Sequence, residues 1–303
     1  MGAKGIAQIV VLWALLLLGA LAMAFGFSMR TEALASRNGL EAARAYYQAR
    51  TGIHRAVAEL AARGVRAVAG TTITGSGEGS SYEVRVEAES GKMDINFVSE
   101  PVLKEMLKNG GLSVEEADRV GDAILDWKDE DDRPREHGAE EAEYLSLHEP
   151  IRPRNARMTS VEELRYVMGV TPEFFRKFLS RVFTVHSRMP QVDVHFAPAE
   201  VLRALPGFSP EMAETLIAKR NESPFRSPAE VAALFQGEGI PSSTFSLLTL
   251  RGSSNVVTLT ATGRAEGGIV RVVRCTVNAG GAAARGSNVI IWNDYAEKEE
   301  QGE

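Results

Sequence analysis

The first segment of the chain is apolar throughout. From Ile6 to Phe27 there is no Asp, Glu, Lys, Arg, Pro or His. At about 1.5 Å per helical residue this run is roughly 33 Å long, enough to cross a bilayer core of about 30 Å. Because a single segment can pair all its backbone amides in lipid only as a helix, the pattern predicts a transmembrane helix over residues 6–29.

The pattern then changes to that of an amphipathic helix. Between Arg30 and Arg63, apolar residues recur at spacings of three and four, and most charged residues lie between them. Gly64 and Gly70 follow, as is typical after a helix end. We therefore expect one long helix that leaves the membrane and enters a folded domain.

Two later segments alternate apolar and polar residues with the period of a β-strand. The first pairs residues 71–74 with 82–89 across a Gly-rich turn, and the second pairs 256–264 with 268–277. An isolated two-stranded hairpin is marginal in water, so we expect the two hairpins to share one antiparallel sheet. The residues between them would then be an insertion.

This insertion, residues 98–250, is mostly helical in pattern and contains an internal repeat. A helix, a Gly-containing turn and a second helix follow a short motif that begins at Asp94 and again at Asp193, and shorter versions begin at Val161 and Pro228. These are helix-hairpin-helix (SAM-like) units, each too small to bury its own core. We expect them to pack together as an all-α domain.

The N-terminus has three interpretations. The first is a cleaved signal peptide, for which the small-x-small sequences at 20–22 and 22–24 are candidate cleavage sites. However, the apolar run follows Met1 to Gly5 and continues straight through both sequences. An uncleaved anchor uses the same residues. The third is a prepilin-type leader, cut after Gly5 by a membrane peptidase so that the helix remains on a mature protein beginning at Ile6.

Together the patterns predict an α+β fold with a pilin-like helix and small antiparallel sheet, interrupted by the large all-α insertion. The expected divisions are a leader at 1–5, a transmembrane helix at 6–29, the pilin-like helix and first strands at 30–97, the inserted domain at 98–250, returning strands at 251–279, and a partly disordered tail at 280–303.

Composition and charge exclude several function classes. The single cysteine cannot form an intramolecular disulfide, and no HExxH, GxSxG or P-loop motif is present, so we expect no enzyme. Helix-hairpin-helix units commonly bind nucleic acid, but residues 115–149 contain 14 Asp and Glu against 4 Lys and Arg in a chain of net charge -6. Because this acidic stretch would repel phosphates, we expect no nucleic-acid binding.

The same acidic stretch is the best candidate for a chemical site. Asp126, Asp129 and Asp131 lie where a predicted helix gives way to a Pro-containing loop. Ca²⁺ takes six to eight oxygen ligands in flexible geometry, which such a loop can supply. The spacing is not that of an EF-hand, since Pro134 stands where the glycine belongs. From spacing alone, a calcium site and a solvated acidic loop are both open.

Taken together, these motifs resemble the minor pseudopilin K family of type II secretion systems (general secretion pathway protein K). The residues that carry the resemblance are Lys4-Gly5 before the apolar helix, Asp126 to Asp131 with Gly138-Ala139-Glu140, Ser160 to Arg165, Gly169 to Glu173, and Ala197 to Leu202 with Leu205-Pro206-Gly207.

The resemblance implies processing and location. It implies cleavage after Gly5 by prepilin peptidase, methylation of the new Ile6 amine, and a single-pass protein of the bacterial inner membrane with its soluble domain in the periplasm. It also implies a calcium site at the matching positions Asp126, Asp129, Asp131 and Glu140.

The function implied is that of a minor pseudopilin at the tip of the pseudopilus. There it would initiate or cap filament assembly with other minor pseudopilins and support protein export across the outer membrane. The alternatives are a minor pilin of a type IV pilus-like system and a membrane-anchored helix-hairpin-helix DNA-binding protein.

Overall fold

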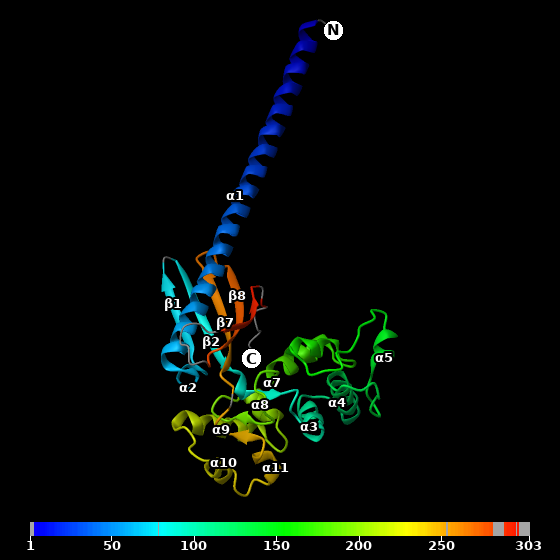
Figure 1. Ribbon diagram of the computed structural model, residues 1–303. Helices are drawn as coiled ribbons and strands as arrows, with labels where there is room; N and C mark the ends of the chain where they lie inside the picture. The colour runs from blue at the N-terminus through cyan, green and yellow to red at the C-terminus, as the bar shows by residue number, and fades with distance from the viewer. Residues whose placement is uncertain (1–2, 78, 253, 281–287, 295, 297–303) are drawn as a thin grey trace.

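The computed structural model describes residues 3–77, 79–252, 254–280, 288–294 and 296. A long N-terminal helix, α1 (Ala3–Arg63), projects away from the rest of the molecule, and a sheet packs against its second half (Figure 1). The inserted helical domain lies at the end of the sheet farthest from the N-terminus. The architecture combines helices with an antiparallel sheet, which confirms the predicted α+β class.

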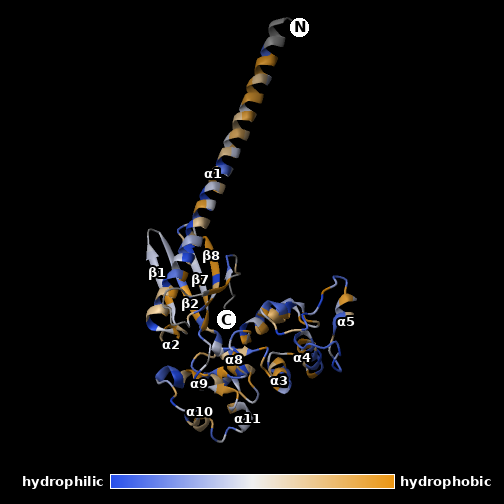
Figure 2. Ribbon diagram, in the orientation of Figure 1, coloured by the Kyte–Doolittle hydropathy of each residue, from blue (hydrophilic) through white to orange (hydrophobic). Residues whose placement is uncertain are grey.

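Helix α1 has two halves with different surroundings. Among the described residues it is the one helix long and apolar enough to cross a membrane, and the most apolar part of it is entirely unburied. Figure 2 shows the projecting part as mostly hydrophobic up to the α1 label, with hydrophilic residues between there and the sheet. In the second half, one stripe is buried against the sheet, as the amphipathic pattern predicted: Ala45, Ala49, Ile53, Ala56 and Leu60. Gly64, at φ 79°, follows the helix in a conformation that favours glycine.

The sheet is antiparallel and has the strand order β1-β2-β7-β8-β9. Its strands are β1 (Thr72–Gly77), β2 (Ser80–Ala88), β7 (Val256–Ala265), β8 (Val270–Asn278) and β9 (Asn288–Asn293). Strands β2 and β7 are hydrogen-bonded neighbours, with Ala88 opposite Val257. The two predicted hairpins therefore share one sheet, and the inserted domain leaves and re-enters it at adjacent strand ends.

Strand β9 was not predicted, because its residues fall in the tail that we expected to be partly disordered. It pairs with β8, where Trp292 lies opposite Cys275. Beyond the strand, Asp294 accepts hydrogen bonds from the Trp292 indole (2.5 Å) and the Tyr46 hydroxyl of α1 (2.8 Å). Contacts to α1 and β8 fix this strand, and a local sequence pattern does not reveal such distant partners.

The inserted domain has its own core. Its helices are α3 (Glu100–Asn109), α4 (Val114–Lys128), α5 (Glu141–Leu145), α6 (Pro172–Phe174), α7 (Ser180–Val182), α8 (Ala199–Ala204), α9 (Pro210–Glu222), α10 (Pro228–Leu234) and α11 (Ser242–Phe245), and a 3-10 segment covers Val161–Tyr166. Met93 and Ile95 belong to this core, so the domain begins a few residues before the predicted boundary at 98. A short helix, α2 (Val65–Val68), follows α1 in the other domain.

The internal repeat has a structural counterpart. Two short parallel strand pairs accompany the two longest helix pairs: β3 (Met93–Asp94) pairs with β4 (Phe183–Thr184), and β5 (Val192–Asp193) pairs with β6 (Leu248–Thr249). The first strand of each pair precedes its helix pair in the chain, and the second strand follows it. In each pair an aspartate fixes the returning chain, since Asp94 accepts from the Arg188 amide at 2.7 Å and Asp193 from the Gly252 amide at 2.8 Å. The assignment of the α3–α4 and α8–α9 pairs to the helix-hairpin-helix class stays a prediction.

Candidate metal centre

The acidic residues singled out from the sequence gather around the C-terminal end of α4 and the loop that leads to α5. Asp126 is in the last turn of α4, and Asp129 follows the end of that helix. Asp131 lies in the loop and Glu140 directly precedes α5. The two helices are held together behind the loop by an edge-on contact between Trp127 and Tyr144, whose ring centres are 5.2 Å apart.

Three of the four carboxylates converge on one point. Asp129, Asp131 and Glu140 each offer an oxygen, and these oxygens lie within 4.8 Å of one another. Glu140 is only 3% exposed, and neither of its carboxylate oxygens has a hydrogen-bond partner among the described residues. Asp129 Oδ1 is in the same condition. Buried carboxylate oxygens without partners are costly, so the donor set fits a hard cation such as Ca²⁺.

Asp126 is held differently from the other three. It is fully buried, and both of its oxygens accept hydrogen bonds from Arg135: Oδ1 from the guanidinium Nη1 at 2.5 Å and Oδ2 from the backbone amide at 3.1 Å. The same Nη1 donates to Asp129 Oδ2 at 2.6 Å. Arg135 therefore joins Asp126 to Asp129 at the edge of the three-carboxylate cluster.

The cluster carries more negative charge than Arg135 offsets. Burial, together with the charges of Asp126 and Asp129, raises the pKa of Glu140 to about 7. Burial likewise raises the pKa of Asp126, against the opposing hydrogen bonds from Arg135. A divalent cation at this point would relieve both effects because it favours the charged carboxylates.

The loop backbone also approaches the site closely. A Cβ atom on Gly138 would lie 1.8 Å from Asp126 Oδ2, so only glycine fits beside this carboxylate.

Other acidic residues nearby already have a cation. Lys104 Nζ lies 2.7 Å from Asp122 and 2.9 Å from Glu100. These residues pair with Lys104 rather than with the candidate centre.

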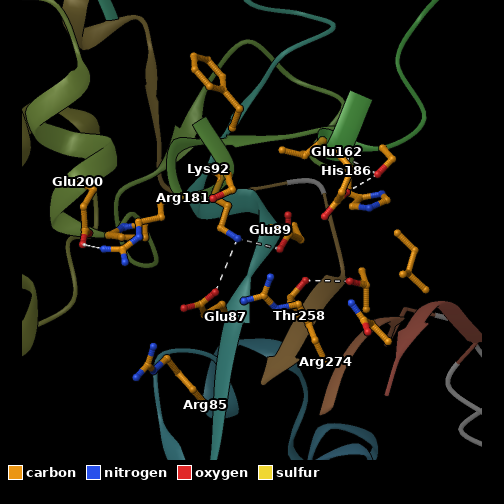
Figure 3. A pocket seen from close by; sticks show the side chains of 18 of the residues that line it. Arg85, Glu87, Glu89, Lys92, Glu162, Arg181, His186, Glu200, Thr258 and Arg274 are labelled. Carbon is orange, nitrogen blue, oxygen red and sulfur yellow. Dashed lines mark hydrogen bonds and ion pairs between the residues drawn. The ribbon is translucent and has the colours of Figure 1, made fainter. Parts of the chain in front are cut away.

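A second charged region lies between the sheet and the inserted domain. A cavity of about 630 Å³ is lined by β2, β7, β8 and β9 on one side and by the inserted domain on the other. Figure 3 shows Lys92 directed toward Glu87 and Glu89, at 3.6 and 3.2 Å. The sequence pattern did not single out Glu89 and Lys92 as a buried ion pair. Their separation of three residues is the one signal that could have indicated it.

The predicted processing residues lie in α1, whose backbone begins at Ala3. Gly5 and Ile6 therefore occupy the first turns of this helix. Met1 and Gly2 lie outside the described residues, and cleavage after Gly5 stays a prediction.

Comparison with protein families identifies the chain. Residues 85–187 and 192–249 match two family models, both described as type II secretion system (T2SS), protein K. The chain belongs to the type II secretion system protein K family. The matched residues contain the candidate metal centre and the second helix pair.

Individual members of the protein K family match over part of their length. A type II secretion system protein K of Dickeya chrysanthemi is 33% identical over 131 residues, which cover 42% of this chain and 36% of that protein. The protein K of Pseudomonas aeruginosa is 28% identical over 160 residues, 50% of this chain and 47% of that protein. These matches span less than half the length of the relatives.

The fold has a solved counterpart. A chain in the crystal structure of the GspK-GspI-GspJ complex from the enterotoxigenic Escherichia coli type 2 secretion system superposes with a TM-score of 0.65. The match covers 87% of this chain and all of that one, at 12% sequence identity. At 12% sequence identity, this match is evidence that the two chains share a fold.

Proposed function

We propose that this protein is a minor pseudopilin at the tip of a type II secretion pseudopilus, where it initiates or caps filament assembly and supports export across the outer membrane. The observation that carries the proposal is α1, whose first half is apolar and unburied while its second half packs on the sheet of a protein K family chain. This role is structural, so we propose no catalytic residue.

Maturation provides the first test. We expect prepilin peptidase to cut after Gly5, leaving a methylated Ile6 at the start of an inner-membrane protein whose soluble domain is periplasmic. The intact mass of protein from membranes should then correspond to a chain that begins at Ile6 when the peptidase is present and at Met1 when it is absent. Gly5→Val should block the cut, whereas Gly2→Val should not. A chain that keeps Met1, or begins after Ala22 or Ala24, would contradict the proposal.

The partners proposed are other minor pseudopilins. The similar chain comes from a complex of GspK with GspI and GspJ, which supports this choice. Site-specific crosslinking along the exposed face of α1 should capture such subunits of the same secretion system. Capture of type IV pilus subunits instead would favour the pilin alternative, and salt-dependent binding to duplex DNA would favour the nucleic-acid one.

We also propose that the candidate metal centre binds calcium. Asp129, Asp131 and Glu140 would supply the convergent oxygens and Asp126 would complete the predicted set. The partnerless, buried Glu140 carboxylate carries this proposal. The ion would supply the positive charge that holds the α4–α5 loop together.

A calcium titration tests the site. At a calcium concentration of 100 times Kd, the folded protein should gain about 2.7 kcal/mol of stability over the chelated protein. Glu140→Gln should remove most of this gain. Glu130→Gln is the matched control, since Glu130 is an exposed carboxylate of the same loop. Equal calcium responses of the two variants would argue against the site.

A further inference from the structure

We propose that Arg135 is a built-in competitor of the metal ion: its guanidinium occupies Asp126 and Asp129 in the ion-free protein and is released when the ion binds. This inference deepens the proposed calcium site and rests on it. It assigns to one arginine of the loop the regulation of ion affinity.

The first argument is the use of the oxygen atoms. A carboxylate oxygen can accept a hydrogen bond and bind an ion at the same time, but both Asp126 oxygens face donors of Arg135. An ion bound there would have to share Asp126 with the positive guanidinium or displace it. Oδ1 accepts from the Arg135 guanidinium at 2.5 Å, and Oδ2 from the Arg135 amide at 3.1 Å. The hydrogen bond from the amide is made by the loop backbone and keeps the loop anchored to α4. The guanidinium is therefore the partner that can leave.

The second argument is access to solvent. The Arg135 side chain is 34% exposed, whereas the Asp126 side chain is fully buried. The guanidinium can therefore move outward into water, where it is well hydrated, but Asp126 has no such route. An exchange of ligands at Asp126 would thus proceed by movement of the arginine.

The third argument is charge. Nη1 also lies 2.6 Å from Asp129 Oδ2, while Asp129 Oδ1 is a buried oxygen without a partner in the described structure. Asp129 thus gives one oxygen to the guanidinium, keeps the other without a partner, and also contributes to the convergent site. A divalent ion there would repel a guanidinium a few ångströms away, so the two cations oppose each other's binding.

The competition has a consequence for the ion-free protein. Without the ion, the guanidinium holds two buried or half-buried carboxylates together and keeps the end of α4 attached to the loop. With the ion, that role passes to the metal. Arg135 therefore stabilises the loop when calcium is absent and lowers its apparent affinity when calcium is present.

The experiment compares calcium binding by the full chain in detergent with that of two variants. Arg135→Gln removes the competitor, and we expect its Kd for calcium to be at least ten times lower than that of the parent protein. Arg133→Gln removes the same charge from an exposed side chain of the same loop, and its backbone hydrogen bond to Asp131 is retained. We expect this control to change the Kd less than threefold.

A second measurement checks the ion-free role. In chelator, Arg135→Gln should unfold at a lower temperature than the parent protein, and saturating calcium should close most of that gap. If Arg135→Gln is too unstable to purify, Arg135→Lys keeps the charge but loses the planar fork, and we expect the same direction with a smaller change.

Two outcomes would overturn the competition. Weaker or unchanged calcium binding by Arg135→Gln would mean that the guanidinium supports the ion-bound site and does not compete with the ion. Equal effects of Arg135→Gln and Arg133→Gln on the Kd would mean that the arginine acts only through the net charge of the loop. Failure of the calcium site itself gives a different result, because the parent protein would then bind no calcium and the stability gap of Arg135→Gln would be the same in calcium and in chelator.

Discussion

Lys92 and Glu89 form a buried ion pair where the sheet meets the inserted domain. Both residues are largely buried, and Thr184 of the inserted domain donates a hydrogen bond to Glu89 at 2.5 Å. A buried pair adds little net stability because both charges lose their hydration. Removal of the lysine is costly, since it leaves the buried Glu89 carboxylate without this cation.

Substitution of the lysine tests this asymmetry. Lys92→Met should lower the free energy of unfolding by about 3–5 kcal/mol, because Glu89 keeps its place without a cation. Lys177→Met is the control, since Lys177 pairs with Glu173 at 2.7 Å on the surface, and it should cost less than about 1 kcal/mol. Urea unfolding of the detergent-solubilised chain measures both, and similar losses would contradict the buried role.

The same pair makes stability depend on acid. Burial alone would raise the pKa of Glu89, but the charge of Lys92 and the hydrogen bond from Thr184 hold it below its usual range. A lowered pKa contributes stability that is present above the unfolded value of about 4.3 and is lost as the pH falls through the folded value. The stability advantage of the parent protein over Glu89→Gln should therefore shrink between pH 6 and pH 3. An advantage that stays constant over this range would contradict the assignment.

The sequence indicated the carboxylates of the candidate metal centre but not the cations around them. Acid-rich spacing at the end of a predicted helix was enough to select Asp126, Asp129 and Asp131, and family resemblance added Glu140. The position of Arg135 between two of them depends on the path of the loop, which no periodic pattern encodes. Burial of Glu89 and Lys92 depends on the approach of a second domain.

At the scale of elements, α1 and β7 approach more closely than side chains would allow. A Cβ atom on Gly263 of β7 would lie 1.8 Å from the Ala45 carbonyl oxygen and 2.7 Å from the Ala49 amide nitrogen. The alanines of the α1 stripe and this glycine together form the contact. The amphipathic period predicted the stripe, but the strand pattern gave no reason to treat Gly263 as a contact residue.

Gly263→Ala should therefore force the sheet away from the helix. We expect a loss of about 1–3 kcal/mol or more, as for an overpacked core. Gly77→Ala is the matched control, because a Cβ atom on this strand residue meets nothing within 4 Å. Thermal unfolding followed by circular dichroism distinguishes the two, and an unchanged midpoint for Gly263→Ala would show that the helix–sheet contact can relax.

At the scale of the whole molecule, α2 connects the sheet domain to the end of the inserted domain. Arg66 donates a hydrogen bond to the Leu250 carbonyl oxygen at 2.6 Å, and the same nitrogen lies 3.3 Å from His195 Nδ1. The arrangement of an anchor, a sheet and a large insertion followed from the sequence patterns. The contacts that set one domain against the other did not, since they join side chains from separate elements.

Loss of this connection should loosen the domain junction without unfolding either domain. Arg66→Ala should cost about 0.5–1.5 kcal/mol and increase hydrogen exchange near residues 248–252. Arg63→Ala removes an arginine whose partner, Glu59, is on the same helix at 3.6 Å, and it should leave exchange at the junction unchanged. Equal exchange in both variants would mean that other contacts hold the junction.

The adjacent ends of the insertion also bear on how the protein folds. Pairing of β2 with β7 closes a loop that contains the entire inserted domain, and loop closure costs entropy that rises with loop length. A domain that folds first brings Ala88 and Val257 together and leaves only a short gap to close. We expect amide protection in α4 to appear before protection in β2 and β7 during refolding, so that the helical domain acts as the nucleus on which the sheet is completed.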